Sequence, residues 1–290
     1  MLEKITAPSI LAQKGQKKIK MITAYDTPSA QIADKAGADI ILVGDSLATV
    51  ILGYETTLSA TMDAMIHHTA AVVRAKTHSL VVGDMPWLSF HVSEEDTIRN
   101  AGRFIREAGA QAVKLEGGRK RLNVIKSLLN AEIPVMGHLG LTPQSFYTTG
   151  GYKVQGKTSK LAMDLVEEAK ILSNAGIFAL ILECIPDKLA QIITKSINIP
   201  TIGIGSGPYC DGQVLVFHDV LGLNFGHIPK FVRPYANFSK IGVDALSKFF
   251  ADIESGKFPA DNESYHMDKA ILKELTSSLK PKNKKVANLS

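Results

Sequence analysis

Eight short apolar segments recur along this 290-residue chain, and each stops at a charged, polar or glycine residue. Runs of this kind, rich in β-branched residues, are typical of strands buried on both faces of a parallel sheet. Helix-length segments separate them, so the alternation predicts an α/β fold, the (β/α)8 TIM barrel, whose active site lies at the carboxyl ends of the strands. The predicted strands are residues 20–24, 40–43, 79–83, 110–113, 133–137, 178–182, 199–204 and 214–217.

The chain length suits one such barrel, which typically takes about 250 residues. We expect residues 1–18 to form a basic N-terminal arm, residues 19–265 a single catalytic barrel, and residues 266–290 a lysine-rich tail that is partly disordered. A last amphipathic helix is predicted at residues 240–254. The long glycine-rich segment 139–157 is expected to cover a substrate, because long loops at the catalytic end usually carry function.

The net charge of +5 does not indicate a nucleic-acid partner. Residues 11–20 and 276–290 each contain four lysines and no acid, and without these eight lysines the charge becomes −3. A mildly acidic body with basic ends offers no basic binding face. No apolar run reaches the roughly 18 residues of a membrane span, and the two cysteines, Cys184 and Cys210, form no disulfide framework. We therefore expect a cytoplasmic enzyme with reduced cysteines, acting on neither a membrane nor a nucleic acid.

Charged side chains stand at the ends of the predicted strands. Because side chains alternate between the two faces of a strand, the charged residues at each strand end lie on the same face as every second residue before them. If that face is the barrel interior, one cluster is expected to contain Asp45, Asp84, Lys114, Glu116 and Glu183.

The carboxylates of Asp45 and Asp84 end neighbouring strands, which lie about 4.8 Å apart in a sheet. Two ionised carboxylates this close repel each other unless a cation lies between them, and oxygen ligands without clustered His or Cys favour Mg²⁺. Glu116, one strand further on, is a third ligand, either directly or through water. The alternative is a buried structural network in which Lys114 pairs with these acids.

Glu183 lies on the sixth strand, across the barrel from the proposed metal pair. A carboxylate that emerges from an apolar strand is partly desolvated, which suits a general base. A 2-oxo acid that chelates Mg²⁺ has an acidified C3 proton, which Glu183 could remove, and Lys114 supplies a fixed positive charge for the anionic substrate or its enolate oxygen. His138 either donates a hydrogen bond to substrate or is a structural histidine at the rim.

Three further motifs have less specific interpretations. The adjacent His67 and His68 point to different helix faces, so we interpret them as structural. Gly205-Ser206-Gly207 either cradles a phosphate or forms a tight turn. A catalytic role for Cys184 is the weaker alternative to a reduced structural thiol.

Taken together, the ordered motifs resemble those of the ketopantoate hydroxymethyltransferase family. The resemblance covers nearly the whole chain up to about Met267 and is carried by residues 21–26, 43–47, 83–86, 113–118, 137–144, 182–186 and 211–219. It implies a barrel enzyme of pantothenate biosynthesis that transfers a hydroxymethyl group from 5,10-methylenetetrahydrofolate to 3-methyl-2-oxobutanoate.

The same resemblance implies roles for individual residues. Asp45, Asp84 and Glu116 are assigned to Mg²⁺, and Glu183 is assigned to proton abstraction. The residues expected at the oxo acid are Asp45, Ser46, Asp84, Lys114 and His138. The resemblance also implies a large homo-oligomer, a decamer. The folate contacts do not follow from it, because the long loops vary among relatives.

Two other functions remain as alternatives. The first is another Mg²⁺-dependent lyase or mutase acting on a 2-oxo acid, of the phosphoenolpyruvate mutase or isocitrate lyase kind. Related barrels of that kind commonly use a reactive loop cysteine, and neither Cys184 nor Cys210 follows the fourth strand. The second is a catalytically inactive barrel that serves as a binding subunit, which the set of charged rim residues disfavours.

Overall fold

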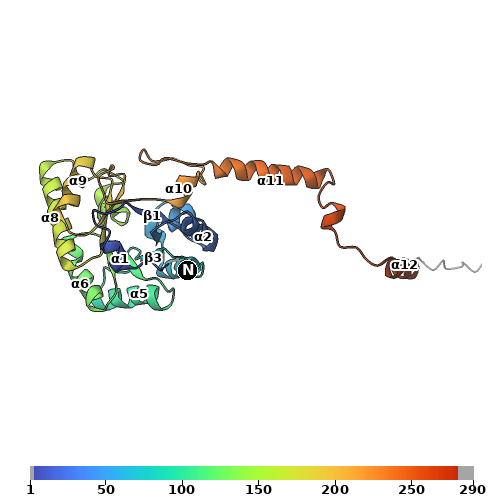
Figure 1. Cartoon of the computed structure of the whole chain (residues 1–290), viewed down its shortest axis with the longest axis horizontal. Coiled ribbons are helices and arrows are strands. Elements are labelled where there is room, and N and C mark those ends of the chain that lie inside the picture. The colour runs from blue at the N-terminus through green and yellow to red at the C-terminus, as the bar shows by residue number, and fades with distance from the viewer. Residues whose placement is uncertain (1–2, 227, 280–290) are drawn as a thin grey trace, which may run out of the picture. The chain divides into compact units, whose positions relative to one another are not determined.

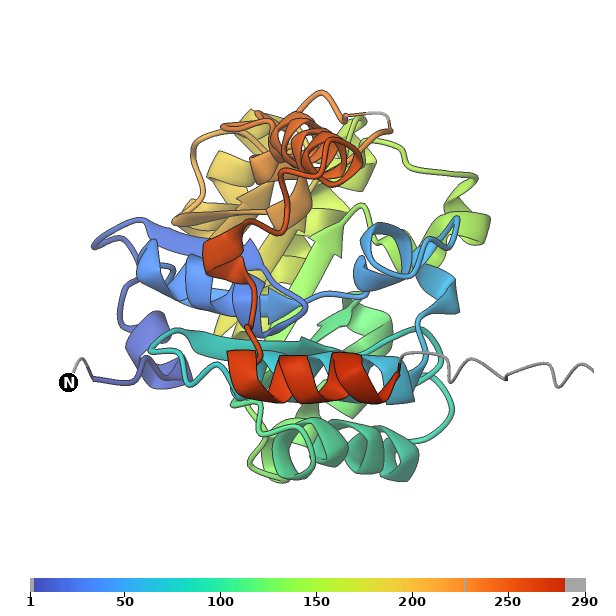
Figure 2. The same cartoon turned by 90° about the vertical axis from the view of Figure 1, so that its right-hand side faces the viewer.

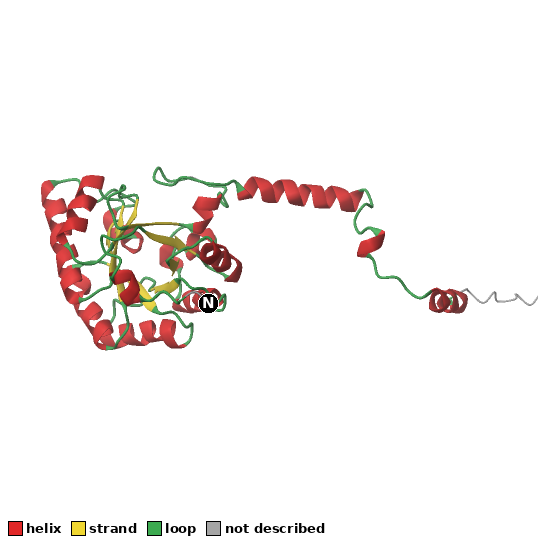
Figure 3. Ribbon diagram, in the orientation of Figure 1, coloured by secondary structure: helices red, strands yellow, loops and turns green. Residues whose placement is uncertain are grey.

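Eight parallel strands close into a barrel in the order of the sequence, drawn in yellow in Figure 3. The computed structural model describes residues 3–226 and 228–279, and it confirms the predicted (β/α)8 architecture. The strands are β1 Ile19–Thr23, β2 Ile40–Val43, β3 Leu80–Asp84, β4 Ala112–Glu116, β5 Val135–Gly140, β6 Ala179–Glu183, β7 Thr201–Ile204 and β8 Gly212–Leu215.

Helices follow the first six strands and cover the outside of the barrel (Figure 1). Most begin at a polar side chain that accepts a hydrogen bond from the first helical turn, for example Asp26, Thr61, Ser93 and Thr158. The long helices are α2 Thr27–Lys35, α4 Met62–Val73, α5 Glu94–Arg106, α6 Leu122–Asn130, α8 Ser159–Ala175 and α9 Asp187–Ser196. Two short helices, α3 Leu47–Val50 and α7 Phe146–Thr149, lie in the loops after β2 and β5.

The last two strands differ from the prediction. The chain passes from β7 to β8 through residues 205–211 without a helix, so this segment is shorter than the alternation suggested. Strand β8 begins at Gly212 and ends at Leu215, two residues before the predicted end. Phe217 instead starts the short helix α10, Phe217–Leu221, because its backbone N–H bonds to Thr23 Oγ1 of β1 at 3.0 Å rather than continuing the ladder.

The buried apolar residues form two layers. One fills the barrel interior with Ile40, Leu42, Val82, Ile181 and their neighbours, and the other lies between the strands and the surrounding helices. The layers follow the alternation of side chains along each strand. Gly83 leaves room for a helix side chain, because a Cβ there would lie 2.3 Å from the ring of Phe104 in α5.

Strand β2 corrects one step of the parity argument. Val43 belongs to the outer layer, and Leu42 points inward. Asp45 does not continue the strand, because β2 ends at Val43 and the chain turns, with Ala48 N–H bonding Asp45 O at 2.9 Å. The turn, rather than the strand, brings Asp45 to the inside.

The N-terminal segment is more ordered than an arm. Residues Ala7–Leu11 form helix α1, the violet-blue helix next to the N label in Figure 2, and a reciprocal capping box between Thr6 and Ser9 starts it. Ile10 is fully buried in the interior layer of the barrel. Lys14 pairs with Asp211 at 2.8 Å. The apolar Ile10 therefore ties the segment to the barrel, although its composition predicted a solvated arm.

The contacts within the chain separate two units, residues 1–237 and 238–290. The second unit holds the predicted last helix, α11 Phe238–Glu254, and a further helix, α12 Lys269–Ser278. The sequence placed the end of the barrel domain at residue 265, and α11, in the second unit, has no buried residue. The predicted disorder of residues 280–290 lies outside the described residues.

No helix in the described part of the chain is both long enough and apolar enough to cross a bilayer.

Candidate active site

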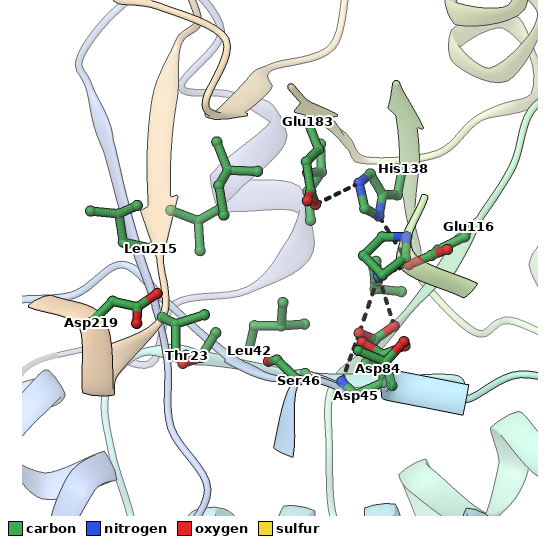
Figure 4. A pocket seen from close by; sticks show the side chains of 18 of the residues that line it. Thr23, Leu42, Asp45, Ser46, Asp84, Glu116, His138, Glu183, Leu215 and Asp219 are labelled. Atoms are coloured by element: carbon green, nitrogen blue, oxygen red, sulfur yellow. Dashed lines mark hydrogen bonds and ion pairs between the residues drawn. The ribbon is translucent and has the colours of Figure 1, made fainter. Parts of the chain in front are cut away.

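A pocket of about 200 Å³ opens at the carboxyl ends of the barrel strands (Figure 4). The structure brings every predicted site residue to it, from the ends of strands β3 to β6 and from the turn after β2. Its ionisable lining residues are Asp45, Asp84, Lys114, Glu116, His138, Glu183 and Asp219. Ser46 lines it as well.

The register between neighbouring strands decides which of these side chains meet. Asp84 of β3 is paired in register with Lys114 of β4, and Glu116 of β4 with His138 of β5. Lys114 Nζ therefore donates hydrogen bonds to Asp84 Oδ2 at 3.1 Å and to Glu116 Oε1 at 3.3 Å. The buried network considered as an alternative does exist, with Lys114 at its centre.

The backbone completes the link between the two aspartates. Asp45 N–H donates to Asp84 Oδ2 at 3.1 Å, so the turn after β2 holds the two side chains next to each other. A Cβ on Gly44 would lie 2.9 Å from Ser46 Oγ and 3.8 Å from Asp84 Oδ2. The absence of a side chain at Gly44 therefore leaves room for the charged groups.

Three carboxylates and one ammonium group share this buried space. Burial raises the pKa of Asp45, and the nearby charge of Asp84 raises it further. Burial also raises the pKa of Asp84, against the opposing effect of Lys114. The pKa of Lys114 is raised, since the attraction of the carboxylates outweighs its burial. The pKa of Glu116 is lowered, because Lys114 and its hydrogen bonds outweigh burial. With all groups ionised, an excess of negative charge remains, which favours a further cation.

Gln144, which the sequence analysis did not single out, cross-links this cluster. Its side-chain Nε2 donates to Asp45 Oδ2 and to Met85 O, both at 3.0 Å, and its backbone N–H donates to Glu116 Oε2 at 3.0 Å. It lies in the predicted substrate loop, but a neutral amide carries no charge signal. Only the fold shows that it contacts residues at or just after the ends of three strands, β2, β3 and β4.

His138 joins the cluster to Glu183. Its Nε2 lies 3.2 Å from Glu183 Oε2, and its Nδ1 lies 3.5 Å from Glu116 Oε1. Burial and Lys114 disfavour the charged ring, but the two glutamates outweigh them and raise the pKa of His138 to about 9. A protonated His138 therefore sits between two carboxylates at neutral pH, and its contact with substrate stays a prediction.

Ser46 has a different partner. Its Oγ lies 2.8 Å from the hydroxyl oxygen of Tyr25, a fully buried ring that follows β1. The hydroxyl lines the pocket beside Asp45. Tyr25 thus holds Ser46 at the edge of the charged cluster.

Other residues singled out in the sequence take structural positions. Ser206 is buried and donates to Leu182 O at 2.6 Å, so this turn is tied to β6. Cys184 and Cys210 are free thiols, as expected. Burial raises the pKa of the Cys184 thiol to about 12, which disfavours a reactive thiolate. His68 Nδ1 contacts Tyr25 O at 2.7 Å, a structural position.

The donor set suits an ion that keeps much of its water. In residues 3–226 and 228–279, no three His, Cys, Asp or Glu side chains form a group arranged to hold a metal ion. Asp45 and Asp84 adjoin each other, whereas Glu116 is occupied by Lys114 and the backbone of Gln144. Two carboxylates with open positions fit Mg²⁺, which typically retains several waters.

The sequence also matches known proteins. The sequence model of the family described as ketopantoate hydroxymethyltransferase matches residues 4–261. A protein from Syntrophomonas wolfei named 3-methyl-2-oxobutanoate hydroxymethyltransferase is 53% identical over 263 residues, covering 91% of this chain and 95% of that protein. One of the same name from Syntrophobacter fumaroxidans is 50% identical over 276 residues, covering 95% of this chain and 98% of that protein. The chain belongs to the ketopantoate hydroxymethyltransferase family.

Solved structures with the same fold are more distant. Phosphonopyruvate hydrolase in complex with oxalate and Mg²⁺ matches with a TM-score of 0.57 at 12% identity, covering 94% of this chain and 96% of that one. A 2,3-dimethylmalate lyase of the phosphoenolpyruvate mutase and isocitrate lyase superfamily matches with a TM-score of 0.53 at 15% identity, covering 94% and 96%. These likenesses show the barrel fold that the hydroxymethyltransferase family shares with them.

Proposed function

We propose that this protein transfers a hydroxymethyl group from 5,10-methylenetetrahydrofolate to 3-methyl-2-oxobutanoate and so forms ketopantoate. The observation that carries the proposal is the buried pair Asp45 and Asp84 beside Lys114, facing Glu183 across one pocket, in a chain of this family. The alignments to relatives named for that activity support it, because they cover nearly the full length of both proteins.

Mg²⁺ is the metal we propose for this site. Asp45 and Asp84 would hold it, with Glu116 acting through water, because Glu116 already accepts hydrogen bonds from Lys114 and from Gln144 N–H. A divalent ion there supplies positive charge that stabilises the carboxylate and enolate oxygens of a 2-oxo acid. The oxalate and Mg²⁺ in phosphonopyruvate hydrolase show that a barrel of this fold can hold such a pair.

Glu183 is the proposed base. It takes the C3 proton of 3-methyl-2-oxobutanoate, and the electrons of the C3–H bond form the C2=C3 double bond of the enolate. The C2 carbonyl re-forms as C3 bonds to the methylene carbon of the folate, and both bonds from that carbon to N5 and N10 break. Water provides the hydroxyl group on this carbon, and the proton that water releases and the proton taken from C3 end on the two nitrogens of tetrahydrofolate. His138, 3.2 Å from Glu183, orients the base, while Lys114 and Ser46 contact the oxo acid.

We also propose that the enzyme is a homo-oligomer, for which the family resemblance implies a decamer, and that it acts in the cytoplasm. Helix α11 supports self-association through an apolar stripe with helical spacing, in which Leu246, Phe249, Phe250 and Ile253 are all exposed. Light scattering after size-exclusion chromatography tests this proposal, and a monomer of 31.3 kDa would contradict it.

The activity is tested by product analysis. The protein is incubated with 3-methyl-2-oxobutanoate, 5,10-methylenetetrahydrofolate and Mg²⁺, and ketopantoate is measured by mass spectrometry. We expect product only when all three are present. Cleavage of 2-oxo acids without folate would support the lyase or mutase alternative instead.

A further inference from the structure

One carboxylate in the pocket stands apart from the charged cluster. Asp219 comes from the first turn of α10 and lines the pocket on the side away from Asp45, Asp84 and Glu116 (Figure 4). Leu42 lies between the two sides, together with the uncharged Thr23 and Ser46, and Leu215 lies beside Asp219. The pocket therefore has a charged side and an apolar side with a single acid.

The acceptor capacity of Asp219 is incompletely used. Its Oδ1 accepts a hydrogen bond from Asn224 Nδ2 at 2.8 Å. Within residues 3–226 and 228–279, no donor reaches its Oδ2 and no lysine or arginine pairs with it. Burial raises the pKa of Asp219, against the smaller effects of Asn224 and His218. A half-buried carboxylate with a free oxygen gains free energy when a bound molecule supplies N–H donors.

The oxo acid does not suit this position. It is an anion, and a second carboxylate would repel it, whereas Lys114 attracts it to the other side of the pocket. A neutral ring with two adjacent N–H donors matches a carboxylate in a bidentate geometry, as a guanidinium does. The pterin ring of the proposed folate co-substrate carries such an edge, formed by N3–H and the 2-amino group.

We propose that Asp219 recognises the aminopyrimidinone edge of the folate co-substrate and thereby fixes where the one-carbon unit enters the pocket. The inference rests on the proposed function. In a tetrahydrofolate, the N5 and N10 atoms that carry the one-carbon unit lie at the opposite end of the ring system from this edge. Binding at Asp219 directs that unit toward Glu183 and the metal side.

Apolar residues next to Asp219 suit the faces of the ring. Pro229 and Phe231 line the same pocket, and Phe231 is partly exposed, at 38%. An aromatic side chain that lines a pocket packs well against a planar heterocycle. This side of the pocket thus offers an acceptor, Asp219, for the N–H edge of the ring and an apolar surface for its faces.

A structural role for Asp219 makes a different prediction. Acids stabilise the first turn of a helix, and Asp219 occupies the first turn of the short helix α10. If that were its only role, Asp219→Asn would lower the melting temperature without changing how the enzyme selects its co-substrate. Kinetics with two readouts separate the roles.

The first experiment compares Asp219→Asn with the wild type. We expect the KM for 5,10-methylenetetrahydrofolate to rise at least 10-fold, while Mg²⁺-dependent exchange of the C3 proton of 3-methyl-2-oxobutanoate into D₂O stays within twofold. Asp164→Asn, the same change at an exposed position on α8, is the matched control and should leave both unchanged. An unchanged KM for the folate, or an equal loss in both readouts, would overturn the proposal.

The second experiment removes the donor from the ligand. Inhibition by tetrahydrofolate is compared with inhibition by its 2-desamino-2-methyl analogue. The wild type should bind the analogue at least 10-fold more weakly, and Asp219→Asn should bind both alike. Equal binding by the wild type would contradict the proposal, and this arm remains decisive if the variant does not fold. A wild type that exchanges the C3 proton but uses no folate would overturn the proposed function and this inference together.

Discussion

Lys114 stays charged at every physiological pH, because the surrounding carboxylates raise its pKa. It lies between Asp84 and Glu116, so it offsets part of the charge that a metal would otherwise have to balance. With this charge offset, the proposed Mg²⁺ site would need only Asp45 and Asp84 as direct ligands, and its remaining positions would be available for water and a chelating substrate.

Glu183→Gln tests the proposed base. The amide keeps the size of the side chain but cannot accept the proton, so turnover should fall about 10²–10⁴-fold, the usual contribution of a general base. The KM for 3-methyl-2-oxobutanoate and the melting temperature should change little. Near-normal turnover would exclude Glu183 from this role.

Gln144→Leu tests how the metal ligands are held. The variant loses the donors to Asp45 and Met85 but keeps the backbone hydrogen bond to Glu116. We expect binding of Mn²⁺, measured by electron paramagnetic resonance, to weaken about 10-fold or more, as is typical when an outer partner of a metal ligand is removed. Gln191→Leu on α9 is the control. Equal affinities for the two variants would show that Gln144 does not support the site.

The pH dependence of stability tests the charge on His138. Its pKa is about 9 in the folded protein, above the usual value of 6.5, so its contribution is complete below about pH 6.5 and is lost as pH rises through 9. The metal-free wild type should lose more melting temperature between pH 6.5 and 9 than His138→Asn. Parallel curves would mean that His138 is neutral in the fold.

Whether a pocket residue could be predicted from the sequence depended on whether a strand, a turn or a loop carries it. Asp84, Lys114 and Glu116 were predicted because they lie on strands, where parity is readable from sequence, and the register that pairs Asp84 with Lys114 came only from the structure. Asp45 was predicted correctly by an argument that does not hold, since a turn places it. Gln144 is uncharged, and its contacts join residues that are far apart in sequence.

At the scale of elements, the helix α1 shows how a few apolar residues outweigh composition. The lysines near it suggested a solvated arm, but the capping box forms a helix and Ile10 enters the interior layer. Strand β8 shows the reverse case, since its apolar run continues past Leu215 into α10. Periodicity over four or five residues does not distinguish the end of a strand from the start of a helix.

Ile10→Ala tests whether α1 is part of the barrel. Removing a fully buried side chain from the interior layer should lower the free energy of unfolding by about 2–5 kcal/mol. Leu11→Ala, at the exposed neighbouring position, should cost much less. Urea denaturation followed by circular dichroism measures both, and similar losses would contradict the packing of α1.

At the scale of the whole molecule, the barrel concentrates chemistry from six strand ends in one pocket. The charged side is suited to a 2-oxo acid and a metal, and the apolar side with Asp219 is suited to a neutral ring. Two substrates of opposite character can therefore meet inside one cavity. The order of the strands, predicted from sequence, is what brings the two sides together.

The most direct test of this account is exchange of the C3 proton of 3-methyl-2-oxobutanoate into D₂O, followed by nuclear magnetic resonance with Mg²⁺ and with a chelator. We predict exchange that requires the metal, is lost in Glu183→Gln, and is followed by ketopantoate formation when 5,10-methylenetetrahydrofolate is added. An absence of exchange by the wild type with Mg²⁺ and the folate both present would contradict the proposed enolisation at this site.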